Sequence, residues 1–173
     1  LITVQKTPEN YTQILSVFTR DTSDIHALAV HLTYEKGELN GMTKPLQEML
    51  HQVSLVVANL VALSQRVKQL EQLQLINLVP HLTEIREQTL IFLKQENVLS
   101  ARDLQTLPNG FEAGFSELLE KATPAQQIVL AALKMDIRHF IANILAVRLL
   151  WQQIQQGDKE LPAEITPITT KYP

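Results

Sequence analysis

Apolar residues recur at intervals of three and four along most of the chain, which is the period of a helix that buries one face. Two stretches keep apolar residues at the a and d positions of successive heptads. The first consists of Leu46, Met49, Val53, Val56, Leu60, Leu63, Val67 and Leu70, and the second of Leu130, Leu133, Ile137, Phe140, Ile144, Val147, Trp151 and Ile154. Sustained heptads of this kind predict long helices that pack side by side, with these residues in the core.

Signals that begin and end helices divide the chain into segments. Thr7-Pro8, Lys44-Pro45 and Thr123-Pro124 each place a proline in a first helical turn, where its missing N–H costs nothing. Gly37 and Gly157 stand where the apolar period stops, as expected of the left-handed residue that follows a last turn. The long helices predicted from these signals cover residues 8–36, 45–72 and 124–156.

The middle of the chain is predicted to contain the fourth long helix and one short helix. Because Pro80 lacks a backbone donor and clashes with the preceding turn, we expect a break between Gln72 and His81, followed by a helix that extends to about Asn97. A single kinked helix of about 50 residues is the alternative. A short segment capped by Ser100 ends at the turn of residues 107–110, and a short amphipathic helix follows over residues 111–121.

The resulting fold is all-α: an antiparallel bundle of four long helices with one short extra helix, formed by residues 1–157. Residues 158–173 contain three prolines and no helical period, which predicts an extended tail outside the core that serves as a linker or a partner-binding arm.

Composition and charge argue against several classes of fold and function. The 173 residues are 45% hydrophobic but only 5% aromatic, so aliphatic side chains fill the core and an all-β fold is disfavoured. A net charge of −3 with scattered basic residues predicts no nucleic-acid partner. The longest apolar run, Val53–Leu63, is shorter than the ~20 residues that span a bilayer, so no transmembrane helix is expected.

Two pairs of residues have the spacing of metal ligands in di-iron bundles, Glu48 with His51 and Asp136 with His139. The heptad pattern turns Glu48, His51 and His139 outward and puts Asp136 at a flanking position, whereas ligands of a buried metal project inward. We therefore expect solvated side chains, no metal and no other cofactor. A di-metal bundle protein remains an alternative reading.

No residues form a recognisable catalytic motif. The sequence has no cysteine nucleophile, no glycine-rich phosphate loop and no nucleophile elbow. Since catalysis requires a positioned nucleophile, base or metal, we predict that the protein is not an enzyme.

Asp21 is the polar residue that interrupts the apolar seam of the predicted first helix. A carboxylate in an apolar seam costs several kcal/mol unless it is paired, and Arg138 or Arg148 on the last helix could pair with it. Alternatively, the helix rotates and Thr22 takes the inward position.

The last predicted helix is apolar on more than one stripe. The additional apolar residues, on faces that adjoin its seam, include Val129, Ala132, Ile141, Leu145 and Leu149. They form a candidate interaction face, because one seam in a small bundle does not use so much apolar surface. We therefore predict an interaction or sensory module that acts through helix-face contacts with a protein partner or with itself as a homodimer. The alternative is a membrane-active helical toxin component, in which residues 53–63 and 128–150 would meet lipid.

Overall fold

The structure is a computed structural model that describes Arg20 and residues 43–75, 77–95 and 97–157. These residues form four α-helices and one 3-10 helix: α2 (Thr43–Gln72), α3 (Val79–Lys94), η1 (Ala101–Gln105), α4 (Phe111–Lys121) and α5 (Pro124–Gln156). The described part contains no strand, which confirms the all-α prediction. The predicted helix of residues 8–36, with Asp21, and the predicted tail of residues 158–173 lie outside the described residues.

The predicted signals mark the observed helix ends. At the start of α5, the backbone N–H of Gln126 donates to the Thr123 hydroxyl and the backbone N–H of Thr123 donates to the Gln126 side chain, which forms a capping box. Gly157 follows the last turn of α5 in the left-handed conformation, with φ of 76°. One helix ends at Gln72 and the next begins at Val79, so the alternative of a single kinked helix is wrong.

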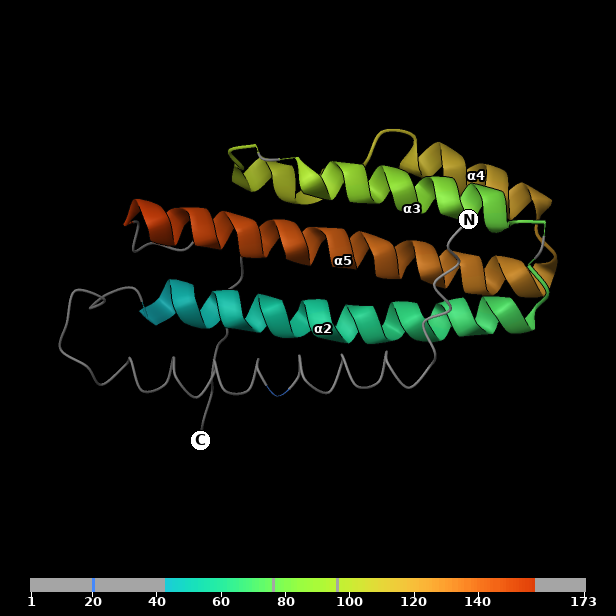
Figure 1. The fold of residues 1–173 in the computed structure, drawn as a ribbon, viewed down its shortest axis with the longest axis horizontal. Helices are drawn as coiled ribbons and strands as arrows, with labels where there is room; N and C mark the ends of the chain where they lie inside the picture. Colours follow the sequence, from blue (N-terminus) through green and yellow to red (C-terminus); the bar gives the residue numbers. More distant parts are fainter. Residues whose placement is uncertain (1–19, 21–42, 76, 96, 158–173) are drawn as a thin grey trace, which may run out of the picture.

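The long helix α5 lies between α2 on one side and the pair α3 and α4 on the other (Figure 1). The helices α2 and α5 run in opposite directions. Near the end of α2, the Gln126 side chain donates to the carbonyl oxygen of Leu73, and further along the pair Arg66 Nε lies 3.0 Å from an oxygen of Asp136. Side chains from all four α-helices enclose the main core, which includes Leu70, Leu78, Ile85, Phe115, Leu118, Leu130 and Leu133.

The buried side of α5 changes along the helix. Leu130 and Leu133 of the predicted seam are buried, but Trp151 is 51% exposed, so its prediction as a core residue is wrong. A heptad repeat drifts by about 20° per heptad on a straight α-helix, hence by about 60° between Leu130 and Trp151. In addition, the second half of α5 turns Leu149 and its neighbours toward η1, where a smaller cluster forms with Leu99 and Leu104.

Candidate functional site

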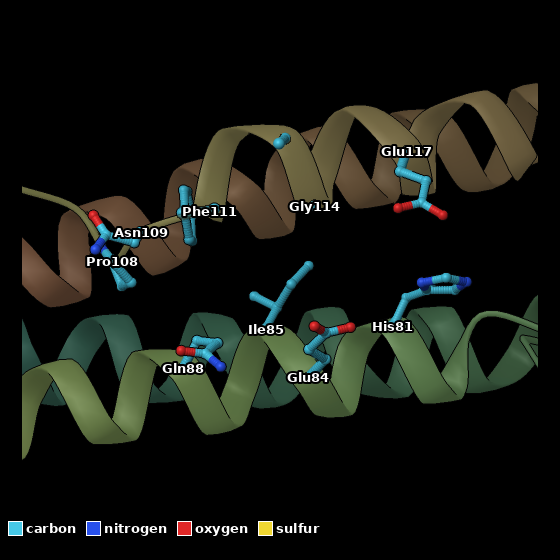
Figure 2. A pocket seen from close by; sticks show the side chains of 11 residues that line it. His81, Glu84, Ile85, Gln88, Pro108, Asn109, Phe111, Gly114 and Glu117 are labelled. Carbon is cyan, nitrogen blue, oxygen red and sulfur yellow. The ribbon is translucent and has the colours of Figure 1, made fainter.

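Two cavities flank α3, one on each side of the helix. The first is a polar cleft of about 460 Å³ between α3 and α4. Figure 2 shows His81 and Glu84 on α3 and Glu117 on α4 along this cleft, with Glu117 directed toward His81. Lys121 Nζ lies 3.2 Å from Nε2 of His81 and forms an ion pair with Glu117. The hydrogen bond from Lys121 lowers the pKa of Glu117, so these groups already satisfy one another.

The floor of the polar cleft is a close contact between two helices. A Cβ atom added at Gly114 of α4 would lie 3.4 Å from Cγ1 of Ile85 on α3, which is van der Waals contact. Ile85 and Thr89 are the buried residues of α3, and the Thr89 hydroxyl donates to the carbonyl oxygen of Ile85. Ile85 lies between the two cavities and lines both, whereas Thr89 lines only the second cavity. The packed surface of α3 is therefore the one that faces α4 and α5, and it lies between the two cavities.

The second cavity is an apolar groove of about 410 Å³ on the other side of α3. One wall is α2, the other wall is α3, and the floor is α5. The main apolar side chains are Leu63, Val67 and Leu70 on α2, Val79, Leu82, Ile85, Leu90 and Leu93 on α3, and Leu133, Ile137 and Phe140 on α5. We call this cavity the apolar groove.

The apolar groove is open because α3 does not pack against α2. Within the described chain, α3 contacts α4 and α5, whereas α2 contacts α5. Several side chains of the walls are about half in solvent: Val67 is 48% exposed, Val79 is 52% exposed and Leu90 is 47% exposed. A contiguous exposed apolar surface in a folded protein is typical of a binding site.

Two charged residues line the apolar groove, one on each wall. Glu71 lies on α2 and Arg86 on α3, and both side chains are exposed. Among the described residues, neither forms an ion pair, in contrast to Arg66 on the same helix as Glu71, which pairs with Asp136. The groove therefore offers one free anion and one free cation beside its apolar surface.

No protein-family model, curated protein or solved structure matches this chain. The geometry of the cavities is therefore the basis for a functional proposal.

The predicted metal-ligand pairs do not come together. Asp136 contacts Arg66, which follows Glu48 by 18 residues in α2, so the two pairs lie roughly 27 Å apart at 1.5 Å per residue. His139 is exposed as predicted. In the part of the chain that the structure describes, no three His, Cys, Asp or Glu side chains are grouped as metal ligands.

Glu48 differs from its prediction as a solvated residue. It is only 2% exposed, and its carboxylate accepts a hydrogen bond from the Gln52 side chain at 3.0 Å. Pro45 and Leu50 are buried as well, and successive residues of a helix are separated by about 100°. The first turns of α2 are therefore enclosed on more than one side, and a heptad assignment does not identify the outward positions there.

The predicted interaction face on the last helix requires a correction. Ile141, Leu145 and Leu149 are buried, while Val129 and Ala132 are half-buried. The broad apolar surface of α5 is used within the chain, because α5 is the central helix and meets several neighbours. These residues do not form an open face for a partner.

The two arginines considered as partners of Asp21 have other contacts. Arg148 donates to the backbone carbonyl oxygens of Leu93 and Gln95, the orphan acceptors at the end of α3. Arg138 lies 3.4 Å from Glu112, whose carboxylate also pairs with Lys134. Both arginines therefore join α5 to neighbouring segments.

Sequence reasoning missed the apolar groove. Val67 and Leu70 were assigned to one continuous seam, which gave no reason to expect Val67 in solvent. The available signal was in α3, where Val79, Leu90 and Leu93 form a second apolar stripe beside that of Leu82 and Ile85. A short helix with two apolar stripes needs a partner on each side.

One property of α2 bears on membrane contact. By length and mean hydropathy, the segment from Lys44 to Gln72 is sufficient to cross a bilayer, and 11% of its most apolar window is buried. No Asp, Glu, Lys or Arg lies between Glu48 and Arg66. An uninterrupted apolar run was therefore too strict a criterion, and the absence of a transmembrane helix stays a prediction.

Proposed function

We propose that the protein is a non-enzymatic interaction module whose apolar groove receives the apolar face of a protein segment. The observation that carries this proposal is the open groove between α2 and α3. Its walls and floor are three helices, which is the arrangement that accepts an amphipathic helix as an additional member of a bundle.

The half-exposed side chains of the groove would supply binding energy when a partner covers them. Val67, Val79 and Leu90 each keep about half of their surface in water. Covering apolar surface contributes roughly 25 cal/mol per Å², and side chains at the centre of such a contact give most of the binding energy. A partner helix with apolar residues at positions i, i+3, i+4 and i+7 would cover these three side chains together.

The non-enzymatic part of the proposal rests on the polar groups of the described residues. In the polar cleft, Glu117, Lys121 and His81 interact with one another. The apolar groove contains only Glu71 and Arg86 as charged groups, on opposite walls. Neither cavity presents a nucleophile next to a base, which is the usual requirement for covalent or acid-base catalysis.

Photo-crosslinking in the cells that make the protein tests the groove as a protein-binding surface. A photoreactive amino acid would replace Val67 in the groove or, as a matched control, Ile128 on α5, which is 74% exposed and does not line the groove. We expect protein adducts at position 67 to exceed those at position 128 by about tenfold, since a groove holds its occupant and an open helix face does not. Equal adducts at both positions, or none at position 67, would contradict the proposal.

A membrane-active component is the second candidate, and the length and hydropathy of α2 favour it. If α2 inserts into lipid, the protein will float with liposomes of anionic and zwitterionic phospholipids at neutral or acidic pH. Replacement of Leu55 by Asp, near the middle of the uncharged stretch, would then abolish flotation. The interaction module predicts that the protein stays at the bottom of the gradient.

A further inference from the structure

The walls of the apolar groove carry opposite charges that can complement a second copy of the same surface. Glu71 on α2 and Arg86 on α3 are exposed, and within the described residues each is without an ion-pair partner. A partner of strongly basic or strongly acidic character would meet one favourable and one unfavourable charge. A partner with the same pair in the reverse order would satisfy both.

Two-fold symmetry provides this reversed order without any further requirement. An axis that passes midway between Glu71 and Arg86 exchanges their positions, so each glutamate meets the arginine of the other copy and two ion pairs form at once. Because the two residues lie on opposite walls, the same axis crosses the middle of the groove and brings its exposed apolar side chains, such as Val67 and Leu90, face to face.

We infer that the occupant of the apolar groove is a second copy of this chain, held in a two-fold symmetric dimer by the Glu71 and Arg86 pairs around an apolar centre. This inference rests on the proposed function, because it names the partner for the same groove. Apolar burial supplies the affinity, and the paired charges fix the register of the two copies.

Charge reversal of each residue separately, and of both in a mixture, tests the symmetric contact. Analytical ultracentrifugation would measure the dimer dissociation constant of the full chain and of Glu71→Arg and Arg86→Glu. In either variant alone, both ion pairs become like-charge contacts, and we expect dimerisation to weaken by about tenfold or more. In an equimolar mixture of the two variants, the mixed dimer restores two opposite-charge contacts, and we expect affinity within about threefold of the wild type.

Two groove variants and one control variant test the apolar centre. Val67→Glu introduces a charge at the contact and is expected to raise the dissociation constant by about 100-fold. Ile128→Glu replaces an apolar residue of similar shape outside the groove and is expected to leave it unchanged. Thermal melts of each variant identify misfolding, and Leu90→Lys at the opposite wall serves as a second groove variant.

Three results would overturn the inference. The wild-type chain is monomeric at about 100 μM, the dimer dissociation constant is the same in Val67→Glu and Leu90→Lys as in the wild type, or mixing the two charge-reversal variants does not restore dimerisation. The photo-crosslinking experiment distinguishes failure of this inference from failure of the proposed function. Adducts at position 67 with the mass of another protein would support a binding groove while excluding a second copy as its occupant. Absence of adducts at position 67 would refute both.

Discussion

The two sides of α3 show how one helix can serve two purposes. Toward α4, Ile85 is 7% exposed, and a Cβ atom added at Gly114 would reach van der Waals contact with it. Ile85 lies at the boundary between the two cavities and lines both. On the side that faces α2, Leu90 is 47% exposed and lines the apolar groove. Both side chains have four carbons on the same short helix, so their hydrophobicity is nearly equal. The difference lies in the neighbouring side chains, and it separates a surface that stabilises the fold from one that is open to solvent.

Truncation of one side chain on each face of α3 is expected to give the largest difference in the free energy of unfolding. We expect Ile85→Ala to lower the free energy of unfolding by about 2–4 kcal/mol, because it removes buried methyl groups and leaves a cavity. Leu90→Ala should lower it by less than about 1 kcal/mol, since half of this side chain is already in water. Urea unfolding at a concentration where the chain is monomeric measures both values. Equal losses would mean that the groove is closed by packing within one chain.

Gly114→Ala sharpens the same comparison on the packed side. Glycine in the interior of a helix costs roughly 0.5–1 kcal/mol relative to alanine, and the added methyl group would reach ordinary contact distance from Ile85. We therefore expect a stabilisation of about 0.5 kcal/mol, measured as a higher urea midpoint with an unchanged slope. A loss of stability would show that α3 and α4 approach more closely than this contact allows, and Ala113→Gly on the exposed side of α4 controls for helix propensity.

Protonation of Glu112 gives a smaller effect that depends on pH. A hydrogen bond from Lys134 lowers the pKa of Glu112, with a further contribution from the positive charges of Lys134 and Arg138. A lowered pKa in the folded state contributes stability that is present above the unfolded value near 4.3 and is lost as the pH falls through the folded value. We expect Glu112→Gln to melt slightly below the wild type at pH 7 and together with it at pH 2. Because the side chain is about half exposed, 0.5 M salt should reduce the difference at pH 7. A difference that persists at pH 2 would point to packing and not to charge.

The features that sequence reasoning predicted well are local ones. The capping box of Thr123 and Gln126, the break before Pro80 and the left-handed Gly157 depend on residues within one or two turns, and each stands where it was expected. Such signals are read directly because the groups that satisfy them are neighbours in the chain.

The features that sequence reasoning did not predict depend on the arrangement of distant segments. Ile141 of α5 is buried although it was expected on an open face, and Trp151 is exposed although it was expected in the core. The reason is that the helix turns its buried side toward η1 along its second half. The open groove likewise depends on α3 packing against α4 and α5 while it avoids α2, which no local spacing in α3 reveals. The candidate site was therefore predictable only as an excess of apolar positions, without its location.

Because the sequence contains no cysteine, single-cysteine variants can show directly whether the apolar groove is open in one copy and covered by a second. Maleimide labelling rates would be compared for Ile85→Cys, Leu90→Cys and Ile128→Cys in dilute and in concentrated protein. We expect slow labelling of Ile85→Cys at both concentrations and fast labelling of Ile128→Cys at both. Labelling of Leu90→Cys should be fast in dilute protein and slow in concentrated protein. If Leu90→Cys is as slow as Ile85→Cys in dilute protein, the groove is not open. If its rate does not change with concentration, no second copy covers it.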